Sequence, residues 1–223
     1  VAAKGASVEQ PPRPDLETLL SDPAMFTEAE AAFAALLTRW RLDYARLAGK
    51  DGCERAAQAG LRCIALSGTW NNLRQFNLPA VLELRDRKSS RHYVLVTALQ
   101  DDRVTLELAG RPYEFTASEV DRYWYGRFQL VWMSPGVEEN ALKRGARGPT
   151  VLWLRAALAR AGGSPAAAGE LFDAALEEQV KAFQRAHRLT PDGVVGQLTL
   201  IQLAGYDSRR APPRLWTAAR AGN

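Results

Sequence analysis

The residues of this chain that could perform nucleophilic or metal chemistry are two cysteines, Cys53 and Cys63, and two histidines, His92 and His187. A cysteine peptidase needs a thiolate, a histidine within hydrogen-bonding reach, and a carboxylate or amide that orients the histidine. A zinc site needs three or four clustered ligands, which two cysteines and two distant histidines cannot supply. We therefore predict no metal and no cofactor. The sequence does not exclude the two facing carboxylates of a glycosidase.

The two cysteines allow two interpretations. In an oxidising compartment Cys53 and Cys63 could pair and close a short loop, which would stabilise the fold by about 2–3 kcal/mol. Alternatively, they are two buried free thiols. The residues alone leave both interpretations open.

Composition indicates a globular protein, with 47% hydrophobic and 24% charged residues and a formal charge of +4. The surplus is uneven, because residues 137–223 hold 12 Lys+Arg against 8 Asp+Glu, whereas residues 1–136 are balanced. This favours weak attraction to an anionic polymer such as the cell wall. We expect no nucleic-acid partner, because the basic residues are scattered and no binding motif accompanies them. No apolar run reaches the roughly 18 residues needed to cross a bilayer, so any membrane attachment would use segments outside this chain.

The first part of the chain changes from helical to strand-like spacing. Residues 15–47 show helical periodicity, with Thr27 and Glu30 resembling a capping box, and residues 53–60 predict one more helix. Six strands are then predicted, at 61–66, 80–84, 93–99, 103–108, 111–116 and 128–132. Turns at 101–102 and 109–110 suit tight hairpins. The pattern predicts an α+β architecture, an antiparallel sheet with helices on one side.

A turn signal at Ser134-Pro135-Gly136 follows the last predicted strand and marks a domain boundary. We divide the chain into a flexible tether at 1–14, a first domain at 15–135, a second domain at 137–205 and a tail at 206–223. In the second domain, Pro149 and Asp173 suit the starts of two helices. A turn at 189–193 leads into a short third helix. These three helices can form one compact bundle, whose fold alone does not define a ligand.

The pattern of this bundle comprises Leu142–Gly148, Val151, Leu154, Phe172-Asp173, Val180, Phe183-Gln184, Leu189, Asp192–Gly196, Thr199 and Leu203. It resembles the peptidoglycan-binding domain attached to many cell-wall hydrolases. The resemblance implies a binding groove beside the Asp192–Gly196 loop and the preceding helix. Gln184, Arg185, Asp192 and Thr199 are the candidates for hydrogen bonds to stem-peptide or glycan groups. Gly193 completes the candidate site, where we expect it to serve the turn more than the ligand.

The first domain carries a second set of ordered segments, Ala56–Leu61, Asn77–Leu82, Arg91–Val96, Tyr113–Phe115 and Trp124–Phe128. Their order is similar to that of the papain-like peptidases that cleave double-glycine leaders, the C39 class. The resemblance makes His92 the match to the catalytic histidine. It also requires an early cysteine behind a glutamine, but residues 15–47 contain neither, and Leu108 stands where the orienting aspartate is expected. Cys53 comes too late in the chain to match the nucleophile.

We therefore interpret His92 as vestigial and the first domain as a degenerate peptidase without catalytic residues. Glu107 could orient His92 only if its strand slipped by one residue, which would turn the side chain to the other face. A rearranged site that pairs Cys53 with His92 is the less favoured alternative. A peptidase-like fold without catalysis still offers a cleft for binding peptides.

A degenerate peptidase-like domain followed by one peptidoglycan-binding module resembles the periplasmic region of the general secretion pathway protein A family. Cys53, Cys63, Gly68–Trp70, Asn77–Ala80 and Trp124–Gly126 fall where that pattern would put them. The resemblance implies an inner-membrane protein whose nucleotide-binding part lies outside this chain. It also implies a periplasmic location, which favours a Cys53–Cys63 disulfide. The implied partners are peptidoglycan, general secretion pathway protein B and the secretin.

The sequence thus favours a non-enzymatic periplasmic scaffold that anchors a type II secretion assembly to peptidoglycan. The alternative is a cell-wall or peptide hydrolase that its binding module directs to the wall.

Overall fold

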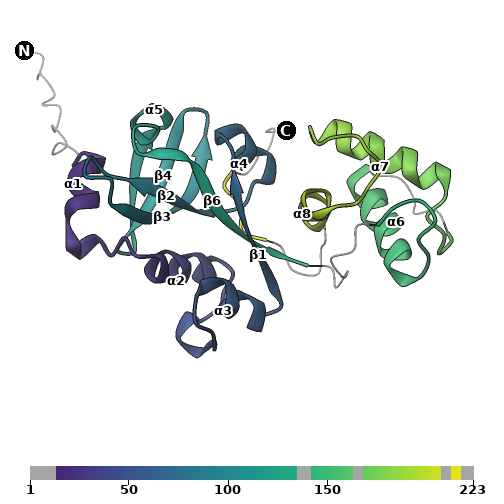
Figure 1. Cartoon of the computed structure of the whole chain (residues 1–223), viewed down its shortest axis with the longest axis horizontal. Coiled ribbons are helices and arrows are strands. Elements are labelled where there is room, and N and C mark those ends of the chain that lie inside the picture. Colours follow the sequence, from purple (N-terminus) through teal and green to yellow (C-terminus); the bar gives the residue numbers. More distant parts are fainter. Residues whose placement is uncertain (1–13, 135–141, 163–167, 207–211, 217–223) are drawn as a thin grey trace, which may run out of the picture.

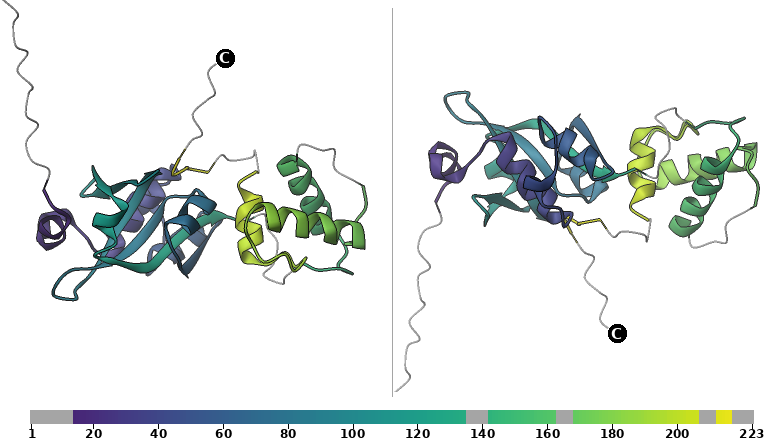
Figure 2. Two further views of the ribbon diagram at one scale, coloured as in Figure 1. Left: turned by 90° about the horizontal axis from the view of Figure 1, so that it is seen from above. Right: turned by 90° about the horizontal axis from the view of Figure 1, so that it is seen from below.

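The computed structural model describes residues 14–134, 142–162, 168–206 and 212–216. Figure 1 shows a sheet flanked by helices and, beside it, a separate group of helices. Figure 2 shows these two parts end to end, with the last helix of the second part nearest the sheet. The predicted tether lies outside the described residues except for Pro14, and the predicted boundary also falls in an undescribed stretch. The division into domains therefore stays a prediction.

Six strands form one antiparallel sheet in the order β1-β6-β2-β3-β4-β5. Their bounds are Leu61–Ser67 (β1), Ala80–Arg85 (β2), Arg91–Gln100 (β3), Arg103–Leu108 (β4), Arg111–Thr116 (β5) and Trp124–Met133 (β6). The hairpin turns lie where the sequence predicts them, with positive φ at Asp101, Ala109 and Gly110. Because side chains alternate along a strand, the sheet presents two apolar faces, and both need cover.

The helices of the first part cover both faces of the sheet, so the predicted one-sided arrangement is wrong. They are α1 (Leu16–Ser21), α2 (Ala29–Arg39), α3 (Gly52–Gln58), α4 (Trp70–Phe76) and α5 (Ala117–Val120), with short 3₁₀ turns at Pro23–Met25 and Tyr44–Arg46. Helices α2 and α3 pack on one face. Helix α4 packs on the other, where the Trp70 and Trp124 rings lie 4.3 Å apart and Phe76 contacts Phe128.

The second part consists of α6 (Pro149–Gly162), α7 (Ala174–Ala186) and α8 (Gln197–Ala204). Asp173 caps α7, as predicted, because its side chain accepts a hydrogen bond from Leu176 N–H at 2.8 Å. Arg155 of α6 is 6% exposed and donates to the carbonyls of Gly169 and Leu171 and to the Asp173 carboxylate. This buried guanidinium fixes the segment that leads into α7.

The two parts are joined by polar contacts from side chains that sequence patterns do not single out. Gln202 of α8 donates to the Gln75 carbonyl at 2.9 Å, and the Gln75 side chain donates to the His187 carbonyl. Residues 212–216 of the predicted tail return to the sheet part. There the Leu99 N–H donates to the Leu215 carbonyl at 3.2 Å, and Leu215 is 3% exposed.

Candidate functional site

The loop at 192–196 is held from inside by the amide of Gln184, which lies on α7. The amide nitrogen donates to Asp192 Oδ1 at 2.8 Å, to the Val194 carbonyl at 2.9 Å and to Thr199 Oγ1 at 3.3 Å. The amide oxygen accepts the Gly193 N–H at 2.9 Å. The nitrogen and the oxygen of this one amide group therefore both help to fix the backbone path of the loop.

This geometry corrects part of the predicted peptidoglycan site. Gln184 is 2% exposed and Thr199 is 4% exposed, so neither side chain offers free atoms to a ligand. Gly193 has φ +75°, and a Cβ there would lie 2.8 Å from Glu177 Cγ, so this glycine serves the turn. Arg185 and Asp192 are exposed, and their contact with peptidoglycan stays a prediction.

The charges around the loop are paired along α7. Lys181 Nζ lies 2.9 Å from carboxylate oxygens of both Glu177 and Glu178, and Arg144 lies 3.8 Å from Glu177. The Lys181 hydrogen bond holds the pKa of Glu177 below its usual range. The Val194 N–H donates to Asp192 and lowers the pKa of that carboxyl. Asp192 is thus an ionised, exposed carboxylate at the loop.

A second polar cluster surrounds His92 at the start of β3. Its Nδ1 lies 2.7 Å from Thr27 Oγ1, and its Nε2 lies 3.3 Å from Asp86 Oδ2. Burial opposes ionisation of Asp86, but hydrogen bonds from the Ser90 backbone and from His92 hold the pKa of its carboxyl below the usual range. A hydroxyl, an imidazole and a carboxylate therefore lie in one row, an order that supports nucleophilic chemistry in other folds.

Two of our predictions around His92 are wrong. Thr27 does not cap a helix, because α2 begins at Ala29 after Glu28 and the Thr27 hydroxyl contacts His92 instead. We also expected no carboxylate to orient His92, because Leu108 stands at the family's position, but Asp86, in the turn before β3, lies beside the imidazole. Its signal in the sequence was an aspartate at the end of a predicted strand, six residues before His92.

The cysteines and Glu107 take no part in this cluster. Cys53 of α3 and Cys63 of β1 form a disulfide, so neither supplies a thiolate. The alternative that paired Cys53 with His92 is therefore wrong. Glu107 pairs in register with Leu95 and forms an ion pair with Arg39 of α2, away from His92.

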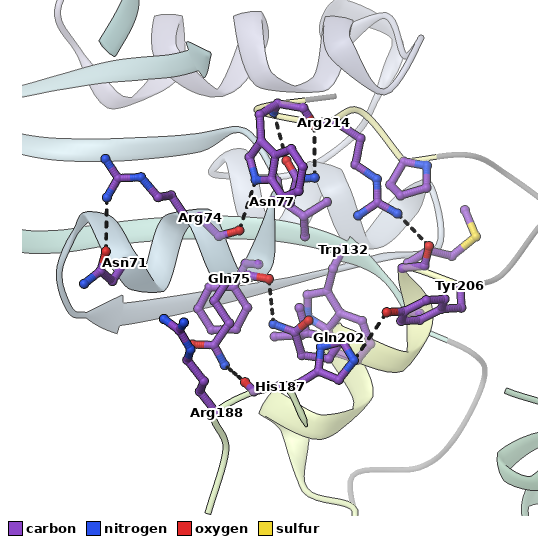
Figure 3. Close-up of a pocket in the computed structure, with 18 of the residues that line it drawn as sticks. Asn71, Arg74, Gln75, Asn77, Trp132, His187, Arg188, Gln202, Tyr206 and Arg214 are labelled. Carbon is purple, nitrogen blue, oxygen red and sulfur yellow. Dashed lines mark hydrogen bonds between the residues drawn. The ribbon is translucent and has the colours of Figure 1, made fainter. Parts of the chain in front are cut away.

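A cavity of about 490 Å³ lies between the two parts of the chain (Figure 3). Its wall comes from α4, the end of β6, the C-terminal ends of α7 and α8, and residues 212–216. Figure 3 shows His187 beside Tyr206, whose hydroxyl lies 3.3 Å from His187 Nε2. Burial lowers the pKa of His187. Sequence reasoning missed this cavity, because its residues come from separate segments with no shared motif.

Neither a metal-binding cluster nor a membrane-spanning helix is found among the described residues. Within residues 14–134, 142–162, 168–206 and 212–216, no group of three or more His, Cys, Asp or Glu side chains is arranged to hold a metal ion. In these same ranges, no helix has the length and apolar character needed to cross a membrane.

This chain is similar to one family model and to two proteins of known name. Residues 147–203 match the family model described as "Putative peptidoglycan binding domain". General secretion pathway protein A of Aeromonas hydrophila is 30% identical over 151 residues, and the Escherichia coli K12 protein named "Putative general secretion pathway protein A" is 29% identical over 153 residues. Each alignment covers 68% of this chain but only 28% and 31% of the respective relative.

A solved structure extends the likeness to both parts of the chain. The periplasmic domain of the EpsAB fusion protein of the Vibrio vulnificus type II secretion system has a TM-score of 0.60 and 25% identity. The match covers 87% of this chain and 86% of that one. The predicted α+β fold class with a helical peptidoglycan-binding module is confirmed. The resemblance of this chain to the periplasmic region of general secretion pathway protein A is likewise confirmed.

Proposed function

We propose that this chain is a non-enzymatic periplasmic scaffold of a type II secretion system, belonging to an inner-membrane protein. In this proposal the helical module binds peptidoglycan, while the sheet part holds general secretion pathway protein B and helps assemble the outer-membrane secretin. The observation that carries the proposal is the match of residues 147–203 to a peptidoglycan-binding family, in a chain whose relatives are secretion proteins. The name of the Vibrio vulnificus relative, an EpsAB fusion protein, supports a partnership with protein B.

The geometry of the loop at 192–196 supports the binding half of the proposal. Gln184 holds this loop from below, so its backbone is preorganised without any ligand. Two exposed charged residues are available here, the anion Asp192 in the loop itself and the cation Arg185, which follows Gln184 on α7. Peptidoglycan carries both carboxylates and amides, and these groups suit such a pair.

Sedimentation with purified sacculi tests peptidoglycan binding. We expect the chain to pellet with sacculi and the double variant Arg185→Gln/Asp192→Asn to pellet less, without loss of folding. Arg160→Gln is the matched control, because Arg160 is an exposed arginine on α6. A wild-type chain that stays in the supernatant at low and moderate salt would refute peptidoglycan binding.

Crosslinking tests the scaffold role. After mild crosslinking in cells, we expect this chain to co-purify with protein B and with the secretin. Absence of both from the crosslinked material, while sacculus binding persists, would limit the function to wall binding.

One observation favours the alternative function of a hydrolase, namely the row Thr27–His92–Asp86. Against it, both cysteines form a disulfide, and a threonine hydroxyl is a far weaker nucleophile than a thiolate. We interpret the row as a structural connection between the start of α2 and the β2–β3 turn. Incubation with sacculi and with double-glycine peptides decides between the two. Release of fragments by the wild type that is lost in His92→Ala would establish an enzyme.

A further inference from the structure

We propose that the cavity between the two parts binds an acidic muropeptide, that is, the stem peptide of peptidoglycan together with its amino sugars. The inference rests on the proposed function, since it names a second wall-binding site in the same chain. This site is distinct from the loop at 192–196, because no residue of that loop lines the cavity.

The charged side chains that line the cavity are all basic. Arg74, Arg188 and Arg214 contribute to its wall, and no aspartate or glutamate is found among the described residues there. Arg188 is exposed at the end of α7, whereas Arg74 donates to Asn71 Oδ1 and Arg214 donates to the Gly205 carbonyl. A concave site with charges of one sign focuses its field and attracts a ligand of the opposite sign. The complementary ligand is therefore an anion, and the carboxylates of a stem peptide meet this requirement.

Flat aromatic faces border the same cavity. Tyr206 is 38% exposed and Trp216 is 41% exposed, which places them among the more exposed large hydrophobic residues of the described chain. His187 lies edge-on to Tyr206 with ring centroids 5.8 Å apart. Aromatic side chains of this kind combine apolar contact area with a polar tip. They suit the faces of sugar rings and the apolar side chains of a short peptide.

The wall of the cavity is held in place without a ligand. Asn77 exchanges two hydrogen bonds with the backbone of Trp216, at 2.9 and 3.1 Å, and the Trp216 indole donates to the Arg74 carbonyl at 3.3 Å. Figure 3 shows Asn77 on one side of the cavity and the Gln75–Gln202 contact on another. Both parts of the chain are therefore needed to form the site.

Size and position favour a wall fragment over a protein partner. The volume of about 490 Å³ lies in the range of small-ligand sites and is not the extended surface that a folded partner covers. Part of the wall, including His187, Arg188 and Gln202, belongs to the segment that matches the peptidoglycan-binding family.

Titration of the whole chain with a soluble disaccharide–tetrapeptide tests the inference, with affinity from calorimetry and location from backbone amide shifts. We expect shifts at residues 202–206 and 216. We also expect about ten-fold weaker binding in Arg188→Gln and for a ligand whose carboxylates are amidated. Arg160→Gln is the matched control and should bind like the wild type. Thermal melts confirm that each variant is folded.

The possible outcomes separate this inference from the proposed function. Shifts confined to residues 192–196, with Arg188→Gln binding like the wild type, would overturn the cavity site and leave peptidoglycan binding intact. If neither sacculi nor the muropeptide binds, both proposals fail. An acidic tetrapeptide without sugars that binds the cavity as tightly as the muropeptide would overturn the choice of ligand and indicate a segment of a protein partner.

Discussion

Replacing Gln184 decides whether this residue holds the loop or contacts the ligand. In Gln184→Ala the Gly193 N–H loses its acceptor and the Val194 carbonyl loses its donor, at 2.9 Å each. Gly193 is buried, so its orphaned N–H would cost about 1–3 kcal/mol. The half-buried Val194 carbonyl, which loses its donor, and the lost packing of the Gln184 side chain add to this cost. We expect the free energy of opening of α7 and α8 to fall by about 2–4 kcal/mol.

Native-state hydrogen exchange of the whole chain measures this change, because it reports the opening of α7 and α8 separately from the sheet. Gln179→Ala is the matched control, since Gln179 lies exposed on the same helix and should change stability by less than about 0.5 kcal/mol. Gln184→Glu should destabilise more than Gln184→Ala, because a carboxylate oxygen would replace the donor that faces Asp192 Oδ1. If Gln184→Ala exchanges like the wild type but loses sacculus binding, the side chain contacts the ligand and our reasoning is refuted.

Three further predictions concern the two parts of the chain. Loss of the Cys53–Cys63 bond, by reduction or in Cys63→Ala, should lower the free energy of unfolding in urea by about 2–3 kcal/mol, and reductant should not affect the variant. Burial lowers the pKa of His187 in the folded state. As the pH falls, this imidazole is therefore protonated in the unfolded state before it is protonated in the folded state. Melts should therefore show the wild type losing stability relative to His187→Gln as the pH falls below about 6.5. Arg155→Met removes the donors to the Gly169 and Leu171 carbonyls and to the Asp173 carboxylate. The free energy of opening measured by hydrogen exchange should then fall by about 1–3 kcal/mol, whereas Arg160→Met should be near neutral.

Local patterns predict most of the fold because they reflect local physics. Alternating side chains and hairpin turns place all six strands, and Asp173 marks the start of α7 as expected. Helix α4 is missed although Trp70, Leu73 and Phe76 have helical spacing. Helix α3 is equally short, but Gly60 marks its end, whereas no glycine follows the seven residues of α4 before the next strand.

The chemistry around His92 could not be predicted, because its partners are determined by tertiary structure. Thr27 lies 65 residues before His92, and its position next to Glu28 is equally typical of a helix start. Asp86 lies close in sequence, but we sought the carboxylate only where the peptidase resemblance expects it. The resemblance indicates where the peptidase family places its carboxylate, at the end of the strand after His92. In this chain the turn before β3 supplies a carboxylate, that of Asp86, to the same histidine.

The residues that identify the helical module differ from those that are free to bind a ligand. Gln184, Gly193 and Thr199 belong to the motif, yet all three are buried, because a short loop between helices needs its backbone groups satisfied from inside. The residues of such a motif stabilise the conformation of the loop. Ligand contacts must then come from exposed side chains around it, such as Arg185 and Arg188, whose replacement should change stability by less than about 0.5 kcal/mol. Recognition of the family therefore predicts the scaffold, whereas the binding residues have to be found from exposure and charge in the structure.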